Sequence, residues 1–249
     1  MTTRDQWIDL NADLGEGMGQ DEALLAVVSS ASIACGGHAG DRSSMTTAVR
    51  AALAHGVTIG AHPSYRDHEH FGRRALDVEP EVLLADLLEQ VRELAQIAKE
   101  QGGQVTYLKP HGALYNTAMA DELVARVVLD AAATALEEPL AVLCLPGSVV
   151  ERLAGERGLV SVRESFADRA STPDGALMPR AIPGAVLHGV EEIVARVPEL
   201  IATGRSICVH GDTPGAVQIA RAVRASLEQE GVTIRSFAQA SGSADRGSR

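Results

Sequence analysis

The chain has 249 residues and a formal net charge of −11, and its hydrophobic share of 45% includes only seven aromatic side chains, three Phe, three Tyr and one Trp. The acidic balance and the scarcity of aromatics oppose a nucleic-acid-binding surface, and they provide no polybasic membrane anchor. No secretory signal pattern opens the chain and no apolar run reaches about 18 residues, so we expect one cytoplasmic globular domain over residues 1–238, with a disordered small polar tail at 239–249.

Seven strand-like runs, bounded by Gly, Pro or Asp, alternate with helical patterns along the chain. We expect the strands at 8–13, 32–36, 58–62, 105–110, 140–145, 159–165 and 206–210. We expect the helices at 21–30, 42–55, 80–101, 118–136, 147–155, 189–203 and 213–230. Pro80 suits the first helical position of its segment, and Pro198 is predicted to kink or split its helix.

This alternation predicts right-handed crossovers and a parallel sheet. Ionisable residues follow most of the strands, and the carboxyl ends of parallel strands are where α/β enzymes assemble their sites. A closed or nearly closed barrel suits this distribution better than an open sheet, which is the alternative. The pattern favours an enzyme.

Asp13, His38 and His62 follow three consecutive predicted strands. One carboxylate with two imidazoles is a ligand set that suits a hydrolytic divalent metal ion with an open water position at the barrel mouth. The alternative is that both histidines only form hydrogen bonds in the site or its turns. Asp41 and Asp212 each precede a predicted helix, where an acidic side chain caps free N–H groups, and Glu16, between two glycines, is expected only to decorate a loop.

Lys109 is one of only two lysines among 22 basic residues, so a generic surface role is not its explanation. Its compact positive charge lies between the apolar pair Tyr107-Leu108 and the pair Pro110-His111. This setting predicts an anion-binding or acid/base role, and the alternative is a buried structural ion pair. Cys35, Cys144 and Cys208 lie in strand-like contexts without metal-finger spacing, which indicates buried reduced thiols. A catalytic thiol at Cys35 or Cys208 is the lesser alternative.

Several arginines lie in loop-like segments after strands, where their guanidinium groups could clamp a carboxylate or a phosphoryl group: Arg73, Arg74, Arg169 and Arg180. Glu164 and Asp168 form a candidate acid/base or cation-holding pair. The segment 211–215 opens the last predicted helix and predicts a phosphate seat there. A conventional P-loop and a dinucleotide-binding fingerprint are both absent from the sequence.

Seven ordered motifs together resemble the LamB/YcsF family, the A subunits of bacterial ATP-dependent 5-oxoprolinase, over about residues 8–237. The motifs are D-L-N-A-D-L-G-E at 9–16, I-A-C-G-G-H-A-G-D at 33–41, G-A-H-P at 60–63, F-G-R-R at 71–74, K-P-H-G-A-L-Y-N at 109–116, F-A-D-R at 166–169 and C-V-H-G-D at 208–212. The resemblance implies a (β/α)7 TIM-like barrel of the glycoside hydrolase/deacetylase type. It also implies opening of the lactam of 5-oxo-L-proline to L-glutamate with ATP and Mg2+, in a complex with two further subunits, B and C.

The implied chemistry assigns provisional roles to the motif residues. Charge stabilisation and proton transfer at the reacting centre are expected of Asp13, Lys109, His111, Asp168 and Arg169. Binding of the substrate carboxylate and of the phosphoryl group is expected of Arg73, Arg74, Asn116, His210, Gly211 and Asp212.

The chain departs from the family pattern in the loop after Glu16, which is shorter than expected, and at three single positions. Gly37 replaces a usual aromatic residue, His70 a usual Gly and Ser171 a usual Tyr. These departures leave the ionisable set intact and bear on substrate fit. Two other functions stay open: a metal-dependent deacetylase or amidohydrolase that needs no ATP, and a non-catalytic subunit that binds 5-oxoproline or another small acid.

Overall fold

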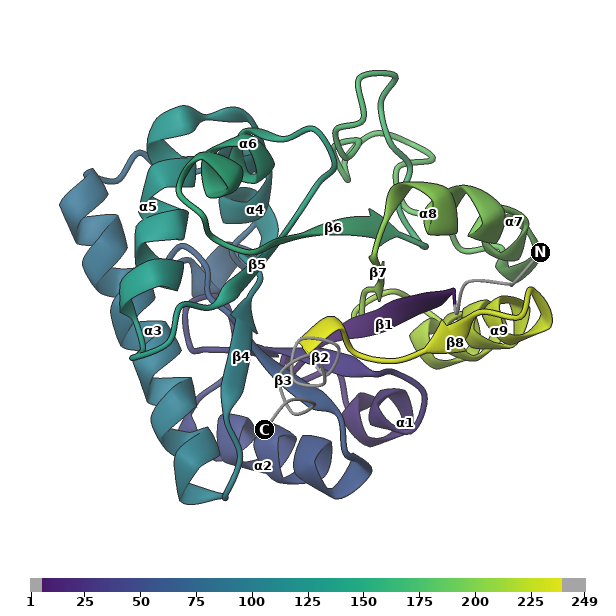
Figure 1. Ribbon diagram of the computed structural model, residues 1–249, viewed down its shortest axis with the longest axis horizontal. Coiled ribbons are helices and arrows are strands. Elements are labelled where there is room, and N and C mark those ends of the chain that lie inside the picture. The colour runs from purple at the N-terminus through teal and green to yellow at the C-terminus, as the bar shows by residue number, and fades with distance from the viewer. Residues whose placement is uncertain (1–5, 239–249) are drawn as a thin grey trace, which may run out of the picture.

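Seven parallel strands close into a barrel in the computed structural model, which describes residues 6–238 (Figure 1). In chain order they are β1 (Trp7–Leu14), β2 (Ser30–Ala34), β3 (Thr58–His62), β4 (Val105–Leu108), β5 (Ala141–Cys144), β6 (Ser161–Phe166) and β7 (Ser206–Val209). Each strand pairs with the next one, and β7 pairs with β1, which closes the ring. The predicted (β/α)7 barrel is therefore confirmed, and the open sheet is wrong.

A short eighth strand, β8 (Thr233–Ile234), was not predicted from the sequence. It lies parallel to the first residues of β1, with Trp7 opposite Thr233 and Ile8 opposite Ile234. β8 therefore lies beside β1 at the amino-terminal end of the barrel, which we call the floor. It is not part of the closed ring. The predicted disordered tail at 239–249 lies outside the described residues.

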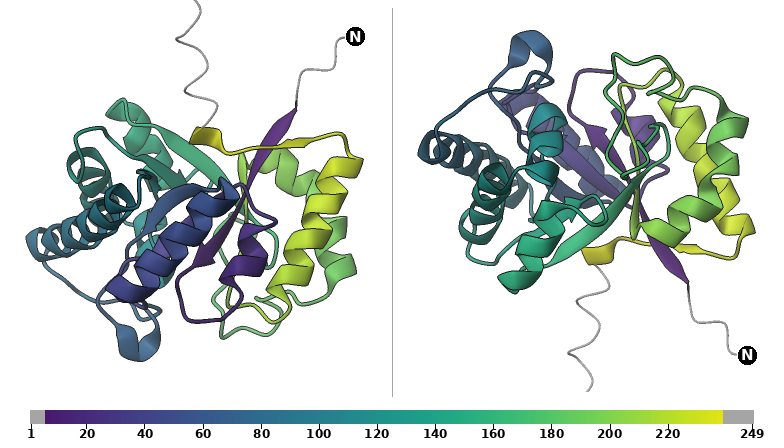
Figure 2. Two further views of the ribbon diagram at one scale, coloured as in Figure 1. Left: turned by 90° about the horizontal axis from the view of Figure 1, so that it is seen from below. Right: turned by 90° about the horizontal axis from the view of Figure 1, so that it is seen from above.

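The helices lie outside the barrel, as the two side views show (Figure 2). They are α1 (Asp21–Leu25), α2 (Arg42–His55), α3 (Pro80–Glu100), α4 (Gly112–Ala120), α5 (Glu122–Thr134), α6 (Val149–Glu156), α7 (Val190–Ala195), α8 (Val197–Thr203) and α9 (Ala216–Gln229), with one 3-10 turn, η1 (His68–His70). None of the helices in the described part of the chain combines the length and the apolar character that crossing a membrane requires.

Local sequence signals explain several helix ends. The Asp41 side chain accepts a hydrogen bond from the Ser44 N–H at 2.8 Å, and Ser44 Oγ accepts one from the Asp41 N–H, so the predicted cap of α2 is confirmed as a capping box. Pro80 stands at the first position of α3, as predicted. The predicted effect of Pro198 is also confirmed, since the segment 189–203 is divided into α7 and α8.

Three predicted helices differ from the structure. The helix expected at 21–30 is only α1, which ends at Leu25, and Ser30 already belongs to β2. The segment 118–136 is two helices, α4 and α5, which are separated at Asp121, whose side chain caps α5 by accepting from the Val124 N–H. The start of α4 was missed because its apolar residues do not form a single stripe: Ala113, Leu114, Tyr115, Ala118 and Met119 are all buried. The last helix, α9, starts at Ala216 and not at 213, because Gly215 takes a left-handed conformation with φ of 80°.

The barrel interior is polar at one seam and aromatic near the floor. Asp9 of β1 accepts hydrogen bonds from Ser30 of β2 and from Ser206 of β7, so its carboxylate links the three strands at which the ring closes. The ring of Tyr107 fills the space beside Gly60, where an added Cβ would lie 2.1 Å from the Tyr107 Cζ atom. The hydrogen-bonded group around Asp9, which we call the polar seam, and the ring of Tyr107 together fill the lower part of the barrel interior.

Candidate active site

A cavity of 390 Å³ opens at the carboxyl ends of the strands, a size typical of small-molecule sites. Most of the residues singled out from the sequence line it: Asp13, His62, Arg73, Lys109, His111, Asn116, Arg169, Arg180 and His210. His38, Arg74, Asp168, Gly211 and Asp212 do not line it. The prediction that one rim collects the ionisable groups therefore matches the arrangement of these side chains.

Lys109 lies at the bottom of this cavity and is 2% exposed. Its Nζ donates to Asp13 Oδ1 at 2.8 Å and lies 3.0 Å from Glu164 Oε1 and 3.0 Å from Cys208 Sγ. Although burial disfavours the charged form, the Asp13 carboxylate keeps the pKa of Lys109 well above its usual value. The buried ion pair is thus present, and it faces the cavity through Asp13 and Lys109.

Asp13 is ionised in this setting. Burial alone would raise its pKa, but the nearby His62 and Lys109 hold that pKa well below its usual range. Asn11 completes the group, because its Nδ2 donates to Glu164 Oε1 at 3.0 Å while its Oδ1 lies 3.3 Å from Lys109 Nζ. Cys208 is not a candidate nucleophile here, since burial raises the pKa of its thiol well above the usual value.

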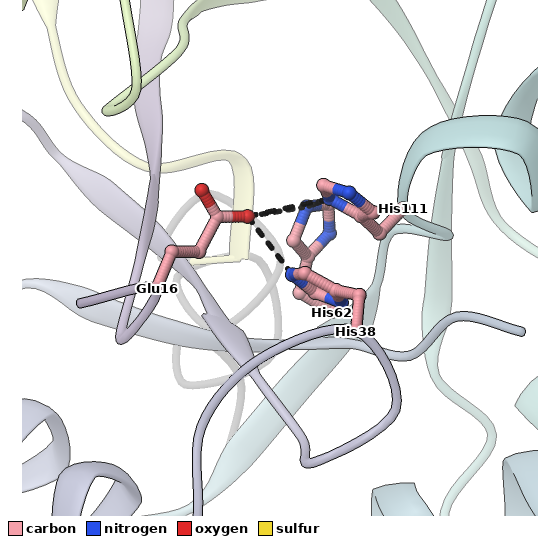
Figure 3. Close-up of side chains that lie close together, drawn as sticks. All are labelled: Glu16, His38, His62 and His111. Carbon is pink, nitrogen blue, oxygen red and sulfur yellow. Dashed lines mark hydrogen bonds and ion pairs between the residues drawn. The ribbon is translucent and has the colours of Figure 1, made fainter. Parts of the chain in front are cut away.

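Glu16 and three histidines form a second buried group beside the cavity (Figure 3). Glu16 Oε1 lies 2.9 Å from His38 Nε2, 3.3 Å from His111 Nδ1 and 3.9 Å from His62 Nε2. The expectation that Glu16 only decorates a loop is therefore wrong: Glu16 lies in the loop after β1, and its side chain is 3% exposed.

The ionisation states in this group follow from burial and contact. Burial lowers the pKa of His38 to about 4 and also lowers that of His111, and the nearby Glu16 carboxylate acts in the opposite direction on both. For Glu16 burial acts in the opposite direction, but the nearby His111 and His38 hold its pKa well below the usual range. His38 and His111 are therefore neutral imidazoles beside the ionised carboxylate of Glu16.

Asp168 supports His210 at the far side of the cavity. His210 Nδ1 donates to Asp168 Oδ1 at 2.9 Å, and the Thr213 hydroxyl donates to the other carboxylate oxygen. Burial opposes ionisation of Asp168, but His210 lowers its pKa. The His210 ring stacks on Phe166, with centroids 5.4 Å apart, so its orientation is fixed on two sides.

Arginines surround the mouth of the cavity. Arg73 and Arg180 both donate to the Asp212 carboxylate, which comes from the loop after β7. The prediction that Asp212 caps the last helix is therefore wrong, since α9 starts four residues later and Asp212 holds two guanidinium groups at the rim. Arg169 is buried and donates to the carbonyl oxygens of Met178 and Ala185, and burial lowers its pKa to about 10.

Gly211 and Arg74 have supporting positions at this rim. A Cβ on Gly211 would lie 2.4 Å from the Asp13 carbonyl oxygen, so this glycine allows the loop after β7 to pack directly against β1. Arg74 is exposed beside Asp67. Of the family departures, neither Gly37 nor His70 nor Ser171 lines the cavity.

A closed parallel barrel of seven strands with helices outside it is also the fold of solved deacetylase structures. Peptidoglycan deacetylase PdaC from Bacillus subtilis shares this fold, with a TM-score of 0.52 over 95% of this chain and 90% of that chain, at 13% identity. The fold resemblance extends to the whole barrel.

The chain belongs to the LamB/YcsF family, whose model matches residues 8–242. It is 50% identical to the A subunit of 5-oxoprolinase from Streptomyces griseus subsp. griseus, an alignment that covers 93% of this chain and all of the relative. The lactam utilization protein from Thermus thermophilus is similar in structure, with a TM-score of 0.85 and 38% identity over 93% of this chain and 100% of that chain.

Proposed function

We propose that this protein is the A subunit of an ATP-dependent 5-oxoprolinase, which opens 5-oxo-L-proline to L-glutamate together with two further subunits, B and C. The observation that carries the proposal is the relative that is half identical over its full length and is named as the A subunit of 5-oxoprolinase. ATP, accompanied by Mg2+, is a co-substrate of the proposed reaction. A cytoplasmic location fits this co-substrate and the three free, buried cysteines.

The cavity provides suitable contacts for a small anionic lactam. Arg73 and Arg180 at the mouth can hold the substrate carboxylate or the phosphoryl group, because guanidinium groups bind both kinds of anion in two-point fashion. Asn116 of α4 adds an amide that can pair with the lactam. Lys109, positive at neutral pH, faces the same space and favours negative charge that develops on the substrate.

The proposed reaction uses one ATP and two waters. Transfer of the γ-phosphoryl group to the lactam oxygen releases ADP and the lactam N–H proton, and leaves a cyclic imidate with a phosphate ester. The first water adds to the activated carbon, and the C–N bond breaks as the nitrogen takes up a proton, which gives γ-glutamyl phosphate. The second water releases phosphate and L-glutamate.

His210 is the best-placed general base for the attacking water. Its Nδ1–H is engaged by Asp168, so Nε2 is the nitrogen that can accept a proton, and the ring lines the cavity. The buried carboxylate of Asp168 also stabilises the imidazolium that forms, as in other Asp–His pairs.

The proposal is tested by measuring glutamate release from 5-oxoproline and ATP by the purified chain alone, and by the chain reconstituted with its two partner subunits. Glutamate from the full mixture only, with one ADP per glutamate, is expected. A demonstrably assembled complex that releases no glutamate would overturn the proposal. A His210→Gln complex separates the catalytic from the non-catalytic reading: loss of kcat is expected if the barrel performs chemistry, whereas a purely binding role would change only KM.

A metal-dependent deacetylase or amidohydrolase without ATP is the second candidate. The observation that favours it is the buried group of Glu16 with three histidines, in a fold shared with a deacetylase. Amide or acetyl hydrolysis by the purified chain alone, in the absence of ATP, would bring this candidate to the front.

A further inference from the structure

We propose that Glu16, His62 and His111 bind one divalent transition-metal ion, with His38 as the residue that positions Glu16. Relative to the set predicted from the sequence, Glu16 takes the place of Asp13, and His111 enters as a ligand. Asp13 accepts from Lys109 through Oδ1, and its Oδ2 lies 3.5 Å from His62 Nε2, but of these two acidic residues only Glu16 has a carboxylate oxygen grouped with all of the histidine nitrogens. The proposal concerns metal binding by this chain and does not depend on the reaction it catalyses.

The three ligand atoms are spaced as a metal ion requires. The separations are 3.0 Å between His62 Nε2 and His111 Nδ1, 3.3 Å between His111 Nδ1 and Glu16 Oε1, and 3.9 Å between Glu16 Oε1 and His62 Nε2. The point in the plane of these three atoms that is equidistant from them lies about 2.0 Å from each, which is the usual zinc-to-nitrogen and zinc-to-oxygen bond length.

Backbone carbonyls fix the tautomers of the two histidines. His62 Nδ1 donates to the Lys109 carbonyl oxygen at 2.7 Å, and His111 Nε2 donates to the Phe71 carbonyl oxygen at 3.0 Å. In the neutral rings, the remaining nitrogens therefore direct their lone pairs toward each other across 3.0 Å. Two facing acceptors repel unless a cation lies between them, and a backbone carbonyl behind each ring is the usual support of a metal-bound histidine.

Ring orientation distinguishes the ligands from the supporting residue. His62 and His111 are nearly perpendicular, at 87°, so their in-plane lone pairs can converge on one point. His38 instead stacks parallel on His111, with ring centroids 3.5 Å apart, so both rings cannot direct lone pairs at the same ion. His38 contacts Glu16 Oε1 at 2.9 Å, which suits a residue that orients the carboxylate (Figure 3).

The three ligand atoms favour one kind of metal ion, and they leave the ion accessible from the cavity. Two imidazoles with one carboxylate suit zinc and its neighbours in the first transition row, whereas magnesium prefers oxygen ligands and water. His62 and His111 line the 390 Å³ cavity, so a fourth position of the ion would face the substrate space. Three protein ligands with an accessible position are the arrangement of reactive metal centres.

The test measures metal content and spectra of the full chain, without any assay of activity. The metal-free protein is incubated with equal amounts of Zn2+, Mn2+, Co2+ and Mg2+ and desalted, and bound metal is measured by mass spectrometry. One equivalent of transition metal and no retained Mg2+ are expected. The Co2+ form is expected to show visible absorption bands of nitrogen and oxygen coordination.

Variants locate the ion, with circular dichroism as the check on folding. His62→Ala and His111→Ala are expected to lose the ion, and Glu16→Gln to bind Zn2+ at least 10-fold more weakly. His38→Phe keeps the stacked ring but removes the contact with Glu16, so it is expected to retain one equivalent with affinity about 10-fold lower and an unchanged Co2+ spectrum. His55→Ala, which changes an exposed histidine paired with Glu22, is the matched control and is expected to bind like the parent.

Three outcomes would overturn the proposal. The parent could bind no transition metal, which would leave a protonated histidine pair as the explanation of the 3.0 Å contact. Folded His62→Ala and His111→Ala could retain the ion. The ion could instead be lost in His210→Ala, which would place it at the group formed by Asp13, Cys208 and His210. A metal-binding chain whose complex releases no glutamate would refute the proposed function alone.

Discussion

A special role of Lys109 could be predicted from the sequence, but its contacts could not. Its rarity in an arginine-rich chain predicted a special role, and the structure places it under the cavity. Its partners could not be predicted, because Asp13, Glu164 and Cys208 come from β1, β6 and β7 and meet only when the ring closes. The same limit explains why Glu16 was taken for a loop decoration, since its three histidine neighbours belong to other segments.

At this scale we predict that Lys109→Met lowers the free energy of unfolding by about 3 kcal/mol, because removal of one partner leaves buried carboxylates uncompensated. Urea unfolding at pH 7 measures the change. Lys99→Met removes the other lysine, which is exposed near the end of α3, and is expected to change stability by less than about 0.5 kcal/mol. Equal stability of the two variants would contradict the prediction.

Most strands and the amphipathic helices could be predicted from the sequence, whereas the start of α4 could not. Strands and amphipathic helices such as α3 were predicted because their side chains repeat with the period of the element. The beginning of α4 was missed because the helix is buried on several sides and starts directly after the Lys109 turn. There Gly112 has φ of 56°, and a Cβ on it would lie 2.5 Å from the Gly72 carbonyl oxygen, a contact no local pattern indicates.

Helix α3 is tied to the loops after β2 and β3 through Gln90. Its side chain accepts from the Ser64 N–H at 3.0 Å and donates to the Ser64 carbonyl oxygen at 2.9 Å. A Cβ on Gly37 would lie 2.3 Å from Gln90 Oε1 and 2.4 Å from Ser64 Oγ. The glycine that departs from the family pattern therefore has a structural reason in this chain, since Gln90 and Ser64 occupy the space beside it.

We predict that Gly37→Ala costs about 1–3 kcal/mol of unfolding free energy by overpacking this contact. The double variant with Gln90→Ala should cost about 1 kcal/mol less than the sum of the single variants, because the smaller side chain makes room. Urea unfolding of the four proteins completes the cycle. Gly155→Ala in α6, where an added Cβ meets nothing within 4 Å, is the control and should not destabilise. Strict additivity would show that the two positions do not compete for space.

At the scale of the whole molecule, the position of the site was predictable and its interior was not. Parallel strands bring their carboxyl ends to one rim whatever the details of packing, so the motif residues had to gather there. The polar seam inside the barrel depends on which strands become neighbours at closure. Asp9, for which the sequence predicted no structural role, is fully buried between β2 and β7.

This seam predicts a pH dependence of barrel stability. Burial raises the pKa of Asp9 to about 6, so the folded chain holds a proton that the unfolded chain has already lost. Stability therefore falls as pH rises from about 4 to about 6, and the contribution of Asp9 is fully present only at the acidic end of that window. Relative to Asp9→Asn, which cannot titrate, the parent should lose about 2–3 kcal/mol of unfolding free energy between pH 4 and pH 7.

Urea unfolding of both proteins at several pH values measures this difference. The difference in unfolding free energy between the parent and Asp41→Asn should show no such fall between pH 4 and pH 6. Asp41 is an exposed helix cap whose pKa is lowered by the backbone N–H of Ser44, so its contribution to stability is lost only when the pH falls below this range. A pH-independent difference between the parent and Asp9→Asn would refute the assignment of a raised pKa.

The pairing of β8 with β1 has a practical consequence for work with this protein. The segments at the beginning and the end of the described chain lie side by side at the floor (Figure 2). Trp7 is opposite Thr233 there, and the cavity opens at the other end of the barrel. A fluorophore or a surface tether attached next to either residue would therefore hold the molecule by its base. The mouth of the cavity would stay free to bind ligands.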